Sequence, residues 1–127
     1  RVVVVADAAL RAVQALVRWD PVGFAEHELS DRQALSLPPA RRLAQVTGSP
    51  EAVSRFVELV DLPAGSTAFG PAPRPRPTGE PVSGWVVTVP LERGDALASE
   101  LRSAMGRLTV RKAAVPRVHV DPAALVL

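Results

Sequence analysis

Two adjacent prolines, Pro38 and Pro39, divide the chain into parts that must fold differently. Proline lacks the backbone N–H that the interior of an α-helix needs, and it pushes the preceding residue, Leu37, toward extended geometry. The helical pattern that leads up to this pair therefore cannot continue through it. We place a domain boundary here, with residues 1–37 on one side and residues 38–127 on the other.

The first part has the pattern of a strand followed by two helices. Val2 to Val5 form a short apolar run, which is typical of a strand buried on both faces in a parallel sheet. Asp7 is a candidate cap for the first helix, and Asp20-Pro21 opens the second. Because a strand and a helix are half of a βαβ unit, we interpret residues 1–19 as the end of a preceding α/β domain. The second helix is then a connector, and the chain is expected to be a fragment of a longer protein.

The second part alternates strand and helix patterns in the order β-α-β-β-α-β. Strands are expected at residues 42–47, 68–70, 82–89 and 117–121, and helices after the caps Ser49 and Asp95. Residues 71–81, which contain five prolines, are expected to form an exposed loop of extended backbone, and residues 107–115 a basic loop. The order predicts an α+β domain of ferredoxin-like topology, with two helices on one face of an antiparallel sheet.

The composition argues against several kinds of site. No cysteine is present, which removes disulfides and thiolate zinc sites. His27 and His119 are far apart without ligand spacing, and no nucleophile accompanies the pair His119 and Asp121 on one strand face. The sequence also lacks the spacing of a phosphate-binding P-loop and any apolar run of 18 residues. We therefore expect no catalytic, cofactor-binding or metal-binding residue and no membrane partner.

Positive charge is concentrated in the second half of the chain. The net charge is +2, but residues 1–70 carry a net charge of −1 and residues 71–127 a net charge of +3. Arginine and lysine side chains on extended backbone can follow phosphate groups with little loss of entropy on binding. Scattered surface charge is the alternative interpretation. The candidate DNA-binding residues are Arg74, Arg76, Arg93, Arg107, Arg111, Lys112 and Arg117.

Trp85, in the strand expected at residues 82–89, has two alternative roles. It could stack on a base, as exposed aromatic side chains do where sheets hold single strands. It could also be the largest core residue of a domain that is poor in aromatic side chains. Its phase with Val87 and Val89 favours the core.

Five short motifs stand in a fixed order along the chain. They are Phe24-Ala25-Glu26 followed by the double proline, Gly70-Pro71-Ala72-Pro73, the strand of Trp85, Arg111-Lys112, and Val120-Asp121-Pro122. In this order and spacing they resemble the C-terminal region of the PriA family of bacterial replication-restart (primosomal) proteins, in the form found in high-GC bacteria. The resemblance covers essentially the whole chain.

The resemblance implies a ferredoxin-like DNA-binding module preceded by the end of the second helicase lobe. The parent protein would be of the helicase class, would recognise stalled forks and would help to reload the replicative helicase. Implied partners are single-stranded or forked DNA, the single-stranded-DNA-binding protein, for which Arg93 is a candidate contact, and the preceding helicase domains. ATP and zinc would be bound outside this segment, so no cofactor is expected here. The expected location is the cytoplasm, in association with the nucleoid.

Two other functions stay open at this point. The domain could be a protein-docking module that binds the helicase core or the tail of the single-stranded-DNA-binding protein and has little affinity for DNA. A small-molecule regulatory domain of the same topology would need a polar pocket at a helix start, and no glycine pattern indicates one.

Overall fold

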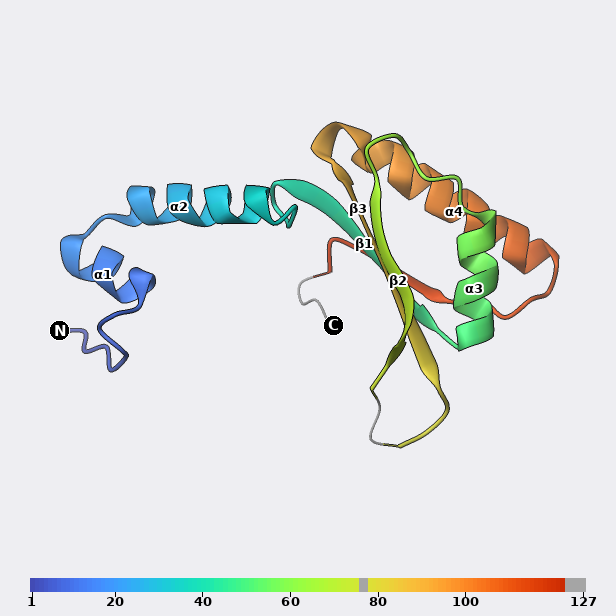
Figure 1. Ribbon diagram of the computed structural model, residues 1–127, viewed down its shortest axis with the longest axis horizontal. Coiled ribbons are helices and arrows are strands. Elements are labelled where there is room, and N and C mark those ends of the chain that lie inside the picture. Colours follow the sequence, from blue (N-terminus) through green and yellow to red (C-terminus); the bar gives the residue numbers. More distant parts are fainter. Residues whose placement is uncertain (76–77, 123–127) are drawn as a thin grey trace.

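The structure, a computed structural model, describes residues 1–75 and 78–122 of the 127-residue chain. In chain order the elements are α1 (Arg11–Arg18), α2 (Pro21–Ala34), β1 (Arg41–Gly48), α3 (Pro50–Leu59), β2 (Thr67–Arg74), β3 (Val82–Pro90), the 3₁₀ helix η1 (Leu91–Arg93), α4 (Gly94–Val110) and β4 (Arg117–Val120). Figure 1 shows a helical N-terminal arm beside a sheet that carries two helices on one side.

The four strands form one antiparallel sheet in the order β2-β3-β1-β4. Helices α3 and α4 lie on the same face of this sheet, and the opposite face carries neither of them (Figure 1). The α+β class is therefore confirmed, and the arrangement is compatible with the ferredoxin-like topology. In the central pair, β3 pairs with the full length of β1, from Arg41 opposite Pro90 to Gly48 opposite Ser83.

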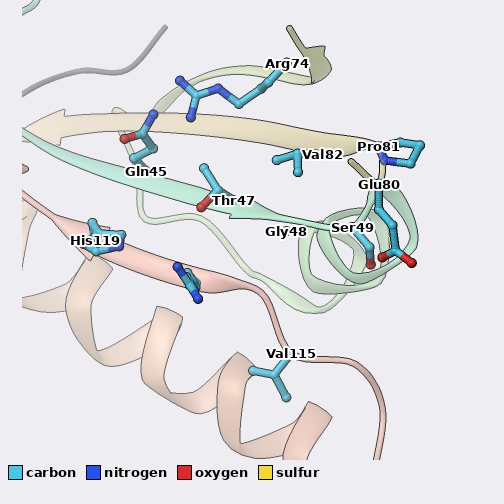
Figure 2. A pocket seen from close by; sticks show the side chains of 11 residues that line it. Gln45, Thr47, Gly48, Ser49, Arg74, Glu80, Pro81, Val82, Val115 and His119 are labelled. Atoms are coloured by element: carbon cyan, nitrogen blue, oxygen red, sulfur yellow. The ribbon is translucent and has the colours of Figure 1, made fainter. Parts of the chain in front are cut away.

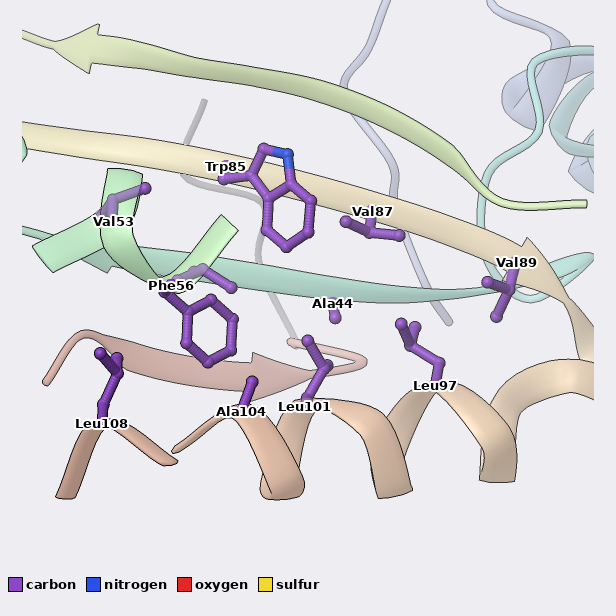
Figure 3. Close-up of a cluster of buried hydrophobic side chains, with 11 residues drawn as sticks. Ala44, Val53, Phe56, Trp85, Val87, Val89, Leu97, Leu101, Ala104 and Leu108 are labelled. Atoms are coloured by element: carbon purple, nitrogen blue, oxygen red, sulfur yellow. The ribbon is translucent and has the colours of Figure 1, made fainter. Parts of the chain in front are cut away.

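The core fills the space between the sheet and the two helices. Trp85, 2% exposed, packs edge-on against Phe56 with their ring centroids 6.4 Å apart. Figure 3 shows both rings between β3 and the helices, with Leu101 and Leu108 of α4 pointing toward them. The core role of Trp85 is thereby confirmed, and a ring covered to this extent has no face left on which a base could stack.

Two of the four helix starts predicted from caps are confirmed. Asp20 accepts a hydrogen bond from the N–H of Gly23 at 2.9 Å and is followed by proline at the first helical position of α2. Ser49 Oγ accepts in the same way from the N–H of Ala52 at 3.3 Å at the start of α3. Asp95 is different, because α4 follows η1 directly and begins at Gly94. The carboxylate thus lies in the first turn rather than at the cap.

The predicted N-terminal strand is not paired within the described residues. Val2 to Val5 are exposed, and neither edge of the sheet pairs with them. The strand was predicted to pair within a preceding domain, so its pairing there stays a prediction. Helix α1 also starts later than predicted, at Arg11, while Asp7 accepts from the N–H of Ala9 in the turn before it. The N-terminal arm of α1 and α2 is held by an ion pair of 3.0 Å between Arg11 and Asp31.

Two loop boundaries also differ from the prediction. Strand β2 continues to Arg74, so residues 71–74 are strand and not loop. This is possible because β2 is an edge strand, where Pro71 and Pro73 can lack an N–H, and because the pairing with β3 shifts register between Phe69 and Ala72. Helix α4 continues to Val110. The basic loop, predicted to begin at residue 107, therefore begins four residues later in the structure.

The domain boundary at Pro38 stays a prediction. The core cluster is drawn from residues 44–108, which agrees with a self-contained second part. Within residues 1–75 and 78–122, none of the helices is both long and apolar enough to cross a membrane.

Candidate nucleic-acid interface

The sheet face opposite α3 and α4 presents a row of side chains that crosses all four strands. The strand register places Phe69 of β2 opposite Val86 of β3, Val86 opposite Gln45 of β1, and Gln45 opposite His119 of β4. These residues alternate with Val46, Trp85 and the other residues that face the core, so their side chains lie on the open side. Phe69 is 59% exposed and His119 is exposed, whereas Val86 is half-buried and Gln45 is buried, at 5% exposed.

The neighbouring row on the same face carries two arginines. Arg117 of β4 lies opposite Thr47 of β1, which lies opposite Gly84 of β3. Arg74 pairs with Val82 two residues farther along, and its side chain reaches back over Gly84. A methyl group built on Gly84 would lie only 2.7 Å from Cδ of Arg74. The absence of a side chain at this glycine therefore lets Arg74 reach across the sheet.

Two adjoining hollows occupy this face. The larger, of about 500 Å³, contains Arg74, Arg117, His119, Gln45 and Thr47 on the sheet. Figure 2 shows Arg74, Gln45 and Thr47 around the hollow, with Glu80 and Ser49 at its far end. Glu80 is the only carboxylate among the described residues that line it. We call this hollow the basic groove, because arginine supplies its charge.

The smaller hollow, of about 200 Å³, is mainly apolar. It shares Gln45 and Arg74 with the basic groove and adds Phe69, Val86 and Pro73. The open face thus places one exposed aromatic ring beside a groove with two guanidinium groups. That combination of a flat apolar surface and cations is what proteins use to hold single-stranded nucleic acids.

The structure brings together only some of the predicted DNA-binding residues. Arg74 and Arg117 both line the basic groove. Arg93 lies in η1, beyond the end of β3 at Pro90, whereas Arg74 pairs with Val82 at its beginning. These two ends of β3 are roughly 27 Å apart at the usual rise per residue of a strand. Arg93 is thus remote from the groove.

Three of the other four predicted residues lie away from the groove. Arg111 and Lys112 are exposed and directly follow α4, and Arg76 lies outside the described residues. Arg107 was expected in a loop but lies in α4, where its guanidinium donates to the carbonyl of Leu59 at 2.6 Å and to Glu100 at 2.8 Å. It is therefore engaged in joining α4 to the end of α3.

Glu100 completes this junction on the helical side of the molecule. The N–H of Asp61 donates to its carboxylate at 3.0 Å, and this hydrogen bond holds the pKa of Glu100 below its ordinary value. Partial burial opposes the shift, while Arg107 adds to it. Within residues 1–75 and 78–122, no cluster of three or more histidine or carboxylate side chains is arranged to hold a metal ion.

Phe69 is the residue that sequence reasoning missed. The sequence placed it in a strand of three residues at best, and its role depends on which face it occupies. That face follows from the pairing of Phe69 with Val86, on the side opposite Trp85, and pairing is set by the whole sheet. The available signal was weak: Thr67 and Phe69 alternate with Ala68, as in a half-exposed strand.

Comparison with known proteins identifies the family. The model of the primosomal protein N C-terminal domain matches residues 33–123, which is well over half of the chain. This chain belongs to the primosomal protein N C-terminal domain family. The resemblance to PriA that the motifs indicated is thereby confirmed.

Relatives of this family member are found in mycobacteria. It is 39% identical over 130 residues to the probable replication restart protein PriA of Mycobacterium leprae and 36% identical over 137 residues to that of Mycobacterium tuberculosis strain H37Rv. Both matches cover 95% of the chain. The chain spans about a fifth of the length of these relatives, at 20% and 21% respectively.

Proposed function

We propose that this domain binds the DNA backbone through the basic groove, as the C-terminal module of a replication-restart protein of the helicase class. The observation that carries the proposal is the convergence of Arg74 and Arg117 on one groove, in which Glu80 is the single carboxylate among the described lining residues. Membership of the primosomal family supports it, since the mycobacterial relatives are named for replication restart. The parent would recognise stalled forks and help to reload the replicative helicase, in association with the nucleoid.

The chemistry of the groove fits phosphate better than base edges. Guanidinium groups donate parallel hydrogen bonds to phosphate oxygens, and such contacts carry no sequence information. Arg74 is anchored in a strand and lies over Gly84, so less of its conformational freedom remains to be lost on binding. Binding of single-stranded or forked DNA with little sequence preference follows from this arrangement.

Salt dependence tests the proposal. Each phosphate contact contributes a slope of about −0.7 to −0.9 to the logarithm of affinity against the logarithm of salt concentration. Reversing both groove charges with Arg74→Glu and Arg117→Glu should weaken binding of a labelled oligonucleotide at least about tenfold and make the slope shallower by about 1.5. Affinity that does not change with salt would overturn the proposal.

A matched control tests whether DNA binds on the open face of the sheet. Arg102 is an exposed arginine on α4, so Arg102→Glu changes the net charge without touching the groove. This variant should retain affinity within about twofold at physiological salt, where charges beyond about 8 Å are largely screened. An equal loss with Arg102→Glu would instead indicate binding by dispersed surface charge.

Protein docking is the second candidate, and the exposed apolar surface of α1 favours it. Val17 is 77% exposed and Trp19 79% exposed. Side chains of this kind fit packing against the preceding helicase domains, which would carry the ATP and zinc sites of the parent. The tail of the single-stranded-DNA-binding protein is the other docking partner, with Arg93 as its proposed contact. Loss of binding to an acidic peptide in Arg93→Glu, with DNA affinity retained, would support this role.

A further inference from the structure

We infer that the open face of the sheet holds unpaired bases, with Phe69 as the stacking platform and the strand of DNA crossing the sheet from β2 to β4. The inference rests on the proposed function and adds the form of DNA that is recognised. Its physical basis is the position of Phe69, the aromatic residue on the open face, next to the arginines of the basic groove.

The exposure of Phe69 is the first argument. Its side chain is 59% exposed, although the sheet offers a covered face on the other side, where Phe56 and Trp85 are at most 2% exposed. A large apolar side chain gains free energy from burial, and Phe69 lines the apolar hollow together with Val86 and Pro73, so a flat ligand seated there would cover all three. A planar ring beside cations suits a nucleobase attached to a phosphate.

The cross-strand order is the second argument. Phe69 and His119 lie at the two ends of one row, with Val86 and Gln45 between them. Three strand spacings separate the ends, which is about 14 Å. A single strand of DNA covers that distance with about four nucleotides, given about 3.4 Å per stacked nucleotide. Both rings can therefore contact bases of one short segment.

The arginines are correctly placed for the backbone of such a segment. Arg74 and Arg117 belong to the neighbouring part of the same face, one near each end of the Phe69–His119 row. Bases can then stack on the exposed rings of Phe69 and His119 at the two ends of the row, while phosphates lie over the basic groove. A duplex cannot bind in this way, because its bases are already stacked and paired, and opening them costs a few kcal/mol.

Substitution of Phe69 separates base stacking from phosphate binding. In the full 127-residue chain, Phe69→Ala should weaken binding of a fluorescent dT12 oligonucleotide by about 5- to 100-fold, the range for loss of one stacked base. Binding of a 12-base-pair duplex should stay within about twofold. Leu91→Ala is the matched control, since Leu91 is also exposed, at 53%, but lies in η1 away from the groove.

An abasic oligonucleotide gives an independent readout. It keeps the phosphates of dT12 and lacks the bases, so the native chain should bind it about as weakly as Phe69→Ala binds dT12. Phe69→Ala should lose nothing further on the abasic strand. Phe69→Leu, which keeps apolar volume without a flat ring, should also be weak, and equal melting temperatures would show that each variant is folded.

The outcomes distinguish the two proposals. An equal loss of single-stranded and duplex binding in Phe69→Ala, or no loss in either, overturns the stacking role. Loss of acidic-peptide binding with retained dT12 binding also overturns it and assigns Phe69 to protein docking. The proposed function fails separately, if the double reversal at Arg74 and Arg117 leaves both kinds of DNA binding unchanged.

Discussion

Arg74 lies directly over Gly84 of the adjacent strand, where any side chain would collide with it at 2.7 Å. We predict that Gly84→Ala displaces the guanidinium and weakens DNA binding by about three- to tenfold, the effect of losing one charge-assisted contact. The melting temperature should change little, because the clashing end of Arg74 is flexible. Fluorescence anisotropy and thermal unfolding measure the two quantities.

The same substitution at Gly106 is the control. Gly106 lies in α4 with open space around it, so alanine there should stabilise the helix slightly and leave DNA affinity unchanged. If Gly84→Ala binds DNA as well as the native chain, the position of Arg74 over the sheet has no role in binding.

Trp85 should matter for stability and not for stacking. Trp85→Ala removes the largest side chain of the core and its edge-on contact with Phe56, so we expect a loss of about 3–5 kcal/mol in the free energy of unfolding. Trp85→Phe should lose less and bind dT12 normally, as measured by urea unfolding and anisotropy. A folded Trp85→Phe variant with reduced dT12 affinity would contradict this assignment.

Glu100 makes stability depend on pH in the acid range. Its pKa is lowered in the folded state, chiefly by the N–H of Asp61, so its contribution is present above the unfolded pKa and disappears as pH falls through the folded pKa. Glu100→Gln should therefore lower the free energy of unfolding at pH 7 by about 1–2 kcal/mol. The difference from the native chain should shrink below about pH 4.5. Urea titrations at several pH values test this, and a difference that grows on acidification would be inconsistent with it.

Asp121 attaches the end of β4 to β1. Its carboxylate accepts from the N–H of Leu43 at 3.0 Å and pairs with Arg42, and its own N–H donates to the carbonyl of Leu43 at 2.7 Å. We expect Asp121→Ala to destabilise the fold by about 1–2 kcal/mol and to speed amide exchange in β4. Asp121→Asn should lose less, since its amide oxygen can still accept and asparagine tolerates the positive φ of 46°.

Sequence patterns predicted an element correctly where the interactions that form it lie between residues close in sequence. The caps Asp20 and Ser49, the apolar period of α3 and the alternation of β3 depend on residues close in sequence, and each predicted element is present. The strand predicted at Val2 to Val5 stays a prediction, because a strand depends on partners from elsewhere and its partners were expected in a preceding domain. The length of β2 was predicted too short, because prolines are compatible with a strand only at a sheet edge, and the sequence does not show which strand lies there.

The candidate site was only partly predictable for the same reason. Basic residues can be listed from sequence, but the convergence of Arg74 with Arg117 depends on the register of β1 with β3 and β4. Arg107 could not be recognised as a structural residue, because its partners Leu59 and Glu100 meet it only in the folded chain. The phase of Trp85 was informative because it concerns one strand alone.

The two prolines in β2 bear on how this molecule behaves when concentrated. Pro71 and Pro73 occupy the outermost strand and present no amide hydrogens along that border. A second molecule that approached edge-on would find few donors with which to extend the sheet, so self-assembly into fibrils is disfavoured from this side. The ring of Phe69 can thus stay exposed on the adjacent face although it belongs to the edge strand β2, because this edge does not readily pair with a second molecule.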